Sequence, residues 1–300
     1  MIPGALRIFY ETVRLGSIRK AGLELGLASS SVSRQIALLE RQIGTQLFTR
    51  TARGMEVNHA GELVAEFART VVLDYDALKE DIDDYHGGRR AHLRIATVES
   101  LVGAGPSAAI AEFGRTFPRV TYELFRMPSP QVVEAVLAAD VDMGLTYAPE
   151  PNAKLRTLAR ISEPLLLLMP DTDGNGGGAA EQRSEVTLDA LAGLRLALPS
   201  ADFGMRRLID QAAGHAGLAF ETILESDSFE TLRTFVADGG GATVLPSRAL
   251  AGKDNSRISA FEIADERLET KTIDLVVLGK RRLSRVMRLF VETLRKQLEP

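Results

Sequence analysis

Apolar residues recur at two different spacings along the chain, and the change of spacing divides it into two parts. Up to about residue 86 they recur every three or four residues, as in helices; from His92 onward, apolar runs alternate with helical stretches. Within the stretch 28–43, three apolar residues fall within about 40° of Val32 on a helix: Ile36, Leu39 and Ile43. The opposite side carries Ser30, Arg34 and Arg41. This pattern predicts a helix that packs on one side and offers hydroxyl and guanidinium groups on the other.

Two shorter helices are predicted before this one. The first covers residues 5–15 on the spacing of its apolar residues and ends at Gly16; the second covers 18–25, between a capping residue at Ser17 and Gly26. Two short helices joined by a tight turn form a helix-turn-helix, whose second helix enters the major groove of DNA. After helix 28–43, Arg50 and Arg53 flank two small residues in a segment predicted to be an arm or wing.

The stretch 61–86 predicts one long helix that pairs with a second copy of the chain. Its apolar residues alternate at spacings of four and three over three heptads, which is typical of a dimerising helix: Val64, Ala68, Val71, Tyr75, Leu78, Ile82 and Tyr85. The alternative is a helix that packs this stripe against its own domain. Gly87 and Gly88 follow and predict a hinge.

From residue 92 the pattern predicts an α/β body. Strands are expected at 93–98, 120–125, 141–147 and 272–279 and in several apolar runs between them, with helices in alternation. Such alternation is typical of a parallel sheet covered on both faces. The glycine-rich stretch 171–184 is expected to be a surface loop.

Charge is distributed unevenly between these parts. Residues 1–60 contain eight Lys and Arg and four acidic residues, a net charge of +4, whereas the whole chain of 300 residues carries −4 and the remainder therefore −8. A DNA-binding protein needs a local basic surface rather than a basic composition. The asymmetry therefore fits a small DNA-binding module attached to an acidic body.

Several classes of protein are disfavoured by composition. The chain has no cysteine, so neither disulfides nor thiolate metal sites are expected, and its four histidines show no metal-binding spacing. No apolar run approaches the roughly 18 residues of a membrane helix, and charges interrupt the N-terminus where a signal peptide would be apolar. We expect a cytoplasmic protein without a cofactor or metal.

Residues 5–62 resemble the winged helix-turn-helix of LysR-type transcriptional regulators. The resemblance rests on Phe9, Gly16-Ser17, the run VSRQI with the following LE, Leu47-Phe48 with Arg50, and Gly61. It implies that DNA is contacted by six residues: Ser29, Ser30, Ser33, Arg34, Arg50 and Arg53. The chain departs from the family at Ala28, where a capping hydroxyl is usual, and at Ser29, where a glutamine is frequent. Base reading is therefore expected to depend mainly on Ser33 and Arg34.

The body resembles the effector domain of the same family, two α/β lobes similar to periplasmic solute-binding proteins. The matching segments are LRIATVES, AADVDMGLTY and SDSFETLRTFVADGGGATVLP. The resemblance implies a mixed architecture: an all-α winged helix-turn-helix domain (1–60), a long linker helix and hinge (61–88), and a two-lobed effector domain (92–300). The first lobe would comprise 92–162 and 268–300, and the second 163–267.

Effector-binding residues are expected where strands end and helices begin, because ligands bind at these positions in open α/β sheets. The candidates are Ser100, Thr146, Ser200, Phe203 and Ser228. For each serine the alternative is a helix cap without a ligand. Glu99 places a negative charge beside Ser100, and Arg126 is a candidate to compensate it or simply a surface residue.

The sequence thus predicts a DNA-binding regulator whose action depends on a small molecule, of unknown identity, held between the lobes. Its partners would be double-stranded operator DNA, a second copy in a homodimer and further copies in a homotetramer, and RNA polymerase if it activates; no membrane partner is expected. The alternative is a small-molecule binder or enzyme on the α/β body, with Ser100 as nucleophile and the N-terminal helices serving only for dimerisation. That alternative requires a general base near Ser100, and no motif around it supplies one.

Overall fold

The computed structural model describes residues 4–51, 54–85, 91–147, 149–171, 184–201, 203–268 and 271–298. It divides into two compact units, residues 1–91 with 280–288 and residues 92–279 with 289–300. The predicted hinge glycines Gly87 and Gly88, and nearly all of the predicted loop 171–184, lie outside the described residues. Within the described ranges, no helix is both long enough and apolar enough to cross a membrane.

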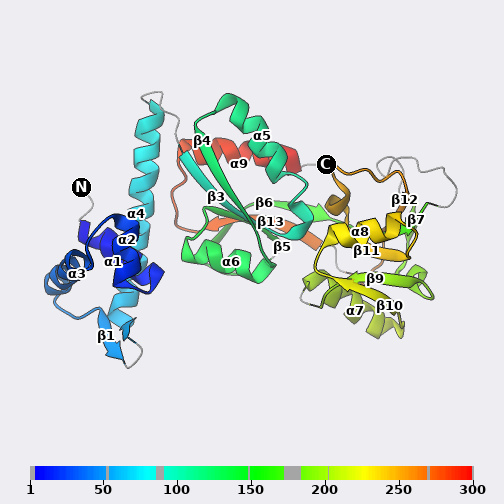
Figure 1. Cartoon of the computed structure of the whole chain (residues 1–300), viewed down its shortest axis with the longest axis horizontal. Coiled ribbons are helices and arrows are strands. Elements are labelled where there is room, and N and C mark those ends of the chain that lie inside the picture. The colour runs from blue at the N-terminus through cyan, green and yellow to red at the C-terminus, as the bar shows by residue number, and fades with distance from the viewer. Residues whose placement is uncertain are drawn as a thin grey trace. The chain divides into compact units, whose positions relative to one another are not determined.

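Three helices form the head of the N-terminal unit: α1 (Gly4–Leu15), α2 (Ile18–Leu25) and α3 (Ser29–Ile43) (Figure 1). The Ser17 side chain caps α2 by accepting a hydrogen bond from the backbone N–H of Lys20, and Gly26 ends α2 in the left-handed conformation. The close turn between α2 and α3 requires Gly22, because a Cβ there would lie 2.7 Å from the carbonyl oxygen of Leu27.

The core beneath α3 uses most of the predicted apolar stripe. Val32 and Ile36 pack with Ile8 of α1, and Leu39 joins Phe9 in the neighbouring cluster. Ile43 was expected to share this stripe but is 43% exposed, because it is the last residue of α3 and the chain turns away at Gly44.

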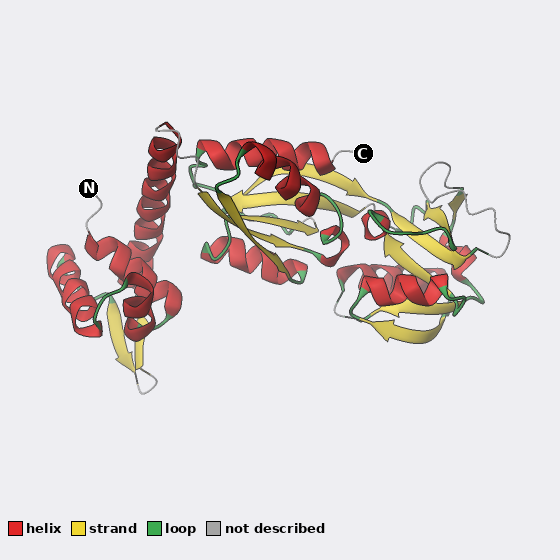
Figure 2. Cartoon of the chain, turned by 45° about the horizontal axis from the view of Figure 1, so that its top comes forward, coloured by secondary structure: helices red, strands yellow, loops and turns green. Residues whose placement is uncertain are grey.

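The wing and the long helix α4 are joined by a fixed corner. The wing is an antiparallel hairpin of β1 (Phe48–Thr51) and β2 (Gly54–Val57), the two yellow strands of the helical N-terminal unit in Figure 2. Asn58 follows it and accepts a hydrogen bond from the N–H of Gly61 in α4 (His59–Tyr85), while its own amide donates to the carbonyl of Gln46. These bonds set the direction in which α4 leaves the wing.

We expect Gly61→Ala to destabilise the protein by about 2–3 kcal/mol, the range of severe overpacking. A Cβ at Gly61 would lie 2.1 Å from the carbonyl oxygen of Leu47, a backbone atom that cannot move aside without disturbing the corner. Thermal unfolding followed by circular dichroism measures the effect. Gly114→Ala is the matched control, because Gly114 is also helical and a Cβ there meets nothing within 4 Å. Equal stability of both variants would contradict this account of the corner.

The first lobe of the second unit is built on a five-stranded sheet. Its order is β4-β3-β5-β13-β6, formed by Val120–Arg126, Ala91–Thr97, Met143–Tyr147, Lys271–Leu278 and Leu155–Glu163. Figure 1 shows α5 (Pro106–Thr116) and α9 (Arg285–Leu298) on one face and α6 (Ser129–Ala138) on the other. Phe113 of α5 packs edge-on against Phe290 of α9, with ring centroids 5.4 Å apart.

The second lobe is built on a six-stranded sheet. Its order is β10-β9-β11-β7-β12-β8, formed by Glu221–Ser226, Arg195–Pro199, Ala242–Pro246, Leu165–Pro170, Ile258–Ile263 and Glu185–Val186. The helices α7 (Gly204–Ala216) and α8 (Phe229–Ala237) belong to this lobe, as do two short 3₁₀ turns, η2 (Leu188–Leu191) and η3 (Ser247–Leu250). The apolar run 165–168 is buried at the centre of its core.

Both sheets are mixed, so the expectation of a purely parallel sheet is wrong. β13 runs antiparallel to β5 and β6, and β7 runs antiparallel to β11 and β12. The reason is the route of the chain, which crosses between the sheets just after β6 and again before β13. β13 therefore begins beside the end of β6, with Lys271 opposite Glu163, and must run in the opposite direction.

Candidate functional site

The outer face of α3 presents the predicted DNA-contacting side chains together. Ser29, Ser30, Ser33 and Arg34 are all exposed, whereas the buried residues of α3 are Val32, Ile36 and Leu39. No side chain caps the start of α3, because Ala28 occupies the capping position. Among the described residues Arg34 has no ion-pair partner, so its guanidinium group is free to bind an external acceptor.

The wing carries the other predicted contact positions. The backbone of Arg50 lies in β1, opposite Met55 of β2. Arg53 lies outside the described residues.

The predicted dimer stripe on α4 is divided between two roles. Ala68 is fully buried, and Val64 and Val71 are half-buried against α1, so the alternative of packing within the chain's own domain holds for the first half of the stripe. Tyr75 is half-buried, whereas Leu78, Ile82 and Tyr85 are exposed. Two further large apolar residues are exposed on the first half, Leu63 at 61% and Phe67 at 60%.

Acidic residues of α4 pair with basic residues of the same unit. Asp76 pairs with Arg7 of α1. Near the end of α4, Asp81 pairs with Arg282 and Asp84 with Arg285, at 2.7 Å and 2.6 Å.

A cavity of about 1020 Å³ lies between the two lobes of the second unit. Four of the five predicted effector residues line it: Ser100, Thr146, Ser200 and Phe203. They come from the ends of strands in both lobes, where the carboxyl ends of strands meet helix starts.

The first lobe contributes a row of buried hydroxyl groups. Ser100, in the 3₁₀ turn η1 (Glu99–Leu101), is 1% exposed, and its oxygen accepts a hydrogen bond from the Tyr147 hydroxyl at 3.2 Å. Thr146 is fully buried, and its hydroxyl lies 3.3 Å from the carbonyl oxygen of Ser129. Because Ser100 accepts from Tyr147, its own proton remains free to donate into the cavity.

Tyr147 was not predicted, although it follows Thr146 at the end of the same strand. Burial first, and then the negative charge of Glu163, raise the pKa of Tyr147 above its ordinary value. The phenol therefore keeps its proton at neutral pH and acts as a hydrogen-bond donor. The signal available in the sequence was its place at the strand end.

The second lobe contributes an aromatic wall. Phe203 and Phe229 lie at the starts of α7 and α8, with ring centroids 5.2 Å apart, and both line the cavity with Met205. Phe229 was not predicted; it begins the helix for which Ser228 was chosen.

Ser228 itself is absent from the cavity lining, which includes its neighbours Asp227 and Phe229. Its hydroxyl accepts a hydrogen bond from the N–H of Thr231 and so caps α8. A helix cap without a ligand was the alternative role for each candidate serine.

An ion pair spans one rim of the cavity. Arg126 binds Glu99 at 3.0 Å, so it compensates the charge beside Ser100, one of the two roles considered for it. Both residues line the cavity, as do Glu134, Glu150, Asp227 and Arg207.

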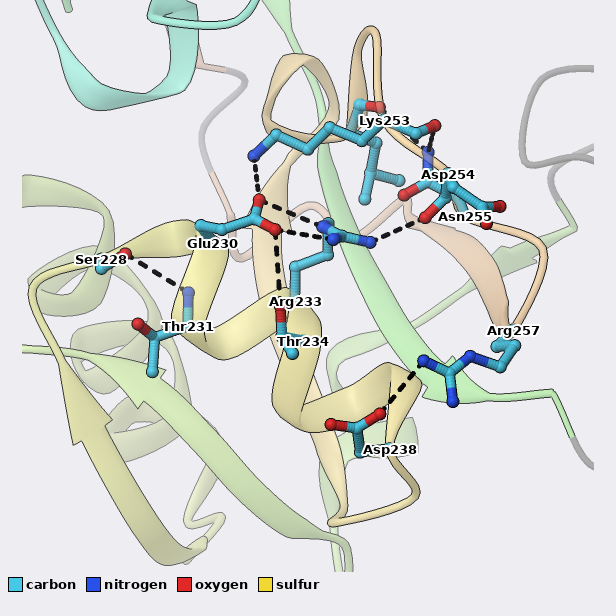
Figure 3. Close-up of polar contacts among 11 residues, drawn as sticks. Ser228, Glu230, Thr231, Arg233, Thr234, Asp238, Lys253, Asp254, Asn255 and Arg257 are labelled. Atoms are coloured by element: carbon cyan, nitrogen blue, oxygen red, sulfur yellow. Dashed lines mark hydrogen bonds and ion pairs between the residues drawn. The ribbon is translucent and has the colours of Figure 1, made fainter.

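Figure 3 shows the polar network that holds α8 to the loop after η3. Glu230 accepts hydrogen bonds from Arg233 at 2.7 Å and from Lys253, and Arg233 also donates to the carbonyl oxygen of Asp254 at 2.7 Å. Hydrogen bonding to Arg233 and Lys253 lowers the pKa of Glu230 to about 2. The network fixes the helix that begins with the cavity residue Phe229.

We expect Glu230→Gln to destabilise the protein by about 0.5–1 kcal/mol at neutral pH, a small value because the side chain is half exposed and screened. The folded pKa lies below the ordinary value of 4.5, so the contribution is present above pH 4.5 and is lost as the pH falls towards 2. Urea unfolding at neutral and acidic pH measures this. Glu221→Gln is the control, since Glu221 has no ion pair among the described residues. A difference that grew on acidification would contradict the assignment.

The cavity offers little support for catalysis or metal binding. The side chain that hydrogen-bonds to Ser100 is the Tyr147 phenol, which keeps its proton at neutral pH because its pKa is raised and is therefore a poor general base. Across the described residues, no group of three or more His, Cys, Asp or Glu could hold a metal ion.

Comparison with known proteins agrees with this geometry. Residues 3–62 match the model of the bacterial regulatory helix-turn-helix proteins of the lysR family, and residues 86–299 match the LysR substrate binding domain. The chain is 29% identical to the uncharacterized HTH-type transcriptional regulator YfeR of Shigella flexneri, over 82% of this chain and 78% of that protein. It is 26% identical to the nitrogen assimilation regulatory protein nac of Escherichia coli, over 85% and 82%.

Solved structures have the same fold. Full-length OxyR from Pseudomonas aeruginosa superposes with a TM-score of 0.69 at 18% identity, covering 99% of this chain and 97% of that one. Full-length CbnR in complex with its target DNA superposes with a TM-score of 0.55 at 19% identity, covering 99% and 100%.

The chain belongs to the LysR family of bacterial helix-turn-helix regulators. It is a DNA-binding transcriptional regulator with an effector-binding domain and not an enzyme, and the predicted fold class is confirmed. Regulators of this family bind DNA and form oligomers.

Proposed function

We propose that a small molecule bound in the cavity between the two lobes controls how this regulator acts on its operator. The observation that supports this most directly is the cavity itself: hydroxyl groups of one lobe face the aromatic wall of the other. A ligand that contacts both lobes binds one interlobe arrangement more tightly than another, which is the condition for shifting the equilibrium between them. Ser100, Thr146, Ser200 and Phe203 would contact it, and Ser228 would act only through α8.

In the DNA-binding module, we propose that Ser33 and Arg34 read bases and that Ser29, Ser30, Arg50 and Arg53 contact phosphates. Guanidinium groups bind guanine edges bidentately, and hydroxyl groups bind phosphates or bases. The exposure of the four α3 residues supports this assignment.

For assembly, we propose a homodimer formed through the exposed stripe of α4, with dimers pairing into a tetramer. Advancing about 100° per residue, five exposed apolar residues fall within about 100° of the helix circumference: Leu63, Phe67, Leu78, Ile82 and Tyr85. It keeps Leu78, Ile82 and Tyr85 from the predicted stripe and has Leu63 and Phe67 in place of its first half, where Ala68 is covered by the chain's own core. A dimer holding two α3 helices about 34 Å apart would read a two-fold operator.

Residues 1–60 would form the DNA-binding domain and 61–88 the linker, with lobes at 92–162 plus 268–300 and at 163–267. The protein would act in the cytoplasm, where its DNA is, and would contact RNA polymerase if it activates transcription.

Filling the cavity tests its role without knowledge of the effector. Ser200→Trp is expected to retain the wild-type footprint position on DNA but to hold transcription from the operator promoter at one level, because the indole ring occupies the ligand space. The measurement is a promoter–reporter fusion across a panel of carbon and nitrogen sources. Ser256→Trp, at an exposed position outside the cavity lining, is the control and should respond as the wild type. A normal response in Ser200→Trp would argue against the cavity as the effector site.

A further inference from the structure

A buried carboxylate lies where the chain crosses from the first lobe to the second. Glu163 is the last residue of β6, and its side chain is fully buried. It accepts a hydrogen bond from the backbone N–H of Arg248 at 3.0 Å, and the Arg248 guanidinium group lies 3.2 Å from its other oxygen. Arg248 belongs to η3 of the second lobe. The pair therefore joins the crossover to the second lobe.

The same guanidinium group also reaches the first lobe. It donates to the carbonyl oxygen of Ser162 at 3.1 Å and to that of Leu298 at 2.6 Å. Leu298 ends α9, where free carbonyl groups favour a cation. One side chain of the second lobe thus binds both the crossover strand and the last helix of the first lobe.

This arrangement adjoins the end of the cavity that contains Ser100. η1, which carries Ser100, contacts η3, which carries Arg248. The Ser100 hydroxyl is bound to Tyr147, and the charge of Glu163 acts on Tyr147, whose pKa it helps to raise. Burial in turn raises the pKa of Glu163, against the opposing effect of Arg248. Polar groups therefore continue from the cavity to the crossover.

We propose that Glu163 and Arg248 are positioning residues that set the angle between the lobes and couple it to occupancy of the cavity at Ser100. This inference rests on the proposed function, because it assigns how that site is read out. Separating a buried ion pair leaves an unpaired charge in a medium of low polarity, so intermediate arrangements are disfavoured. The lobes then adopt discrete arrangements rather than a continuum, as a switch requires.

The test measures the distance between the lobes in the full-length protein. The chain has no cysteine, so Thr116→Cys on α5 and His215→Cys on α7 give one exposed spin label on each lobe. Double electron–electron resonance then reports the distance distribution. We expect Arg248→Gln to shift or broaden the wild-type peak by more than its own width. An unchanged distribution in the folded variant would overturn the proposal.

Arg160→Gln is the matched control. Arg160 binds the fully buried carboxylate of Asp274 through two bonds of 2.7 Å, but both residues lie within the sheet of the first lobe. Its loss also leaves a buried carboxylate unpaired and should not change the distance between lobes. An equal change in both variants would mean that any buried ion pair has this effect, and the proposal would fail.

Arg248→Lys is the second variant if Arg248→Gln does not fold. It keeps the charge beside Glu163 but cannot bind the carbonyl oxygens of Ser162 and Leu298 in the same way. It should show the same change in the distance distribution, in smaller degree.

Coupling to the cavity is tested with an indole ring as the occupant. Ser200→Trp should shift the distance peak in the wild-type background and not in Arg248→Gln. Equal shifts in both backgrounds would show that the Glu163–Arg248 pair does not respond to occupancy of the cavity, and would overturn the coupling. Operator binding is measured on the same samples. If the wild-type protein did not bind operator DNA, the proposed function would be refuted. The distance measurements would still decide whether Arg248 sets the angle between the lobes.

Discussion

Replacing Arg34 with alanine is expected to weaken operator binding by about 1–3 kcal/mol, roughly five- to 150-fold, the value of one bidentate contact with a base. Arg34 is exposed on the outer face of α3, beside Ser33 and away from the buried stripe of Val32 and Ile36. The alanine variant should fold normally because its side chain supports no core. Fluorescence anisotropy with operator DNA and with a scrambled sequence measures both affinity and specificity.

Two controls separate base reading from general charge. Arg34→Lys retains the charge but not the planar fork, so it should keep the salt dependence of binding and lose discrimination between the two DNAs. Arg115→Ala removes an exposed arginine of α5, in the other unit, and should change neither. If Arg34→Ala bound operator DNA like the wild type, Arg34 would not be a base contact.

Introducing acidic residues on the exposed face of α4 is expected to separate the dimer. The double variant Phe67→Asp with Ile82→Asp places charges on side chains that are 60% and 46% exposed in the single chain. If a second copy covers them, burying two unpaired carboxylates would be strongly unfavourable. Operator affinity should then fall by about 10²–10⁴-fold, the usual gain from linking two binding modules.

Sedimentation velocity measures the oligomeric state, and anisotropy the affinity, on the same preparations. Asp83→Lys also changes a charge on α4, at an exposed position about 160° from Leu63 and about 100° from Ile82 on the helix, and should leave the dimer intact. A double variant that sediments as the wild type would refute the proposed stripe.

The helical head was predictable because its signals are local. Ser17 and Gly26 mark the ends of α2 by capping and by a left-handed turn, and the spacing of Val32, Ile36 and Leu39 identifies the buried side of α3. Each signal depends on neighbours only a few residues away, which the sequence displays directly.

The strand directions and the dimer stripe were less accessible for a physical reason. A strand such as β13 has the same alternation whether it runs parallel or antiparallel, and its direction follows from a crossover about 100 residues earlier. Ala68 and Leu78 likewise belong to one heptad pattern, yet one is covered by α1 and the other is exposed. Periodicity shows that a helix face is apolar and does not show what covers it.

The position of the effector site could be predicted from the sequence, but the predicted set of its residues was incomplete. Strand ends identified Ser100, Thr146, Ser200 and Phe203 as candidates, and all four line one cavity. Tyr147 belongs to the site because it donates a hydrogen bond to Ser100, 47 positions earlier in the chain. No local sequence pattern encodes such a contact.

The most direct test of the account is a DNase I footprint of the purified protein on the promoter next to its own coding region. We predict protection over about two or more helical turns, with two-fold symmetry, because a dimer presents two α3 helices to successive major grooves. Arg34→Ala should reduce this protection at the same protein concentration. The absence of protection there and on every genomic fragment tested would contradict the account.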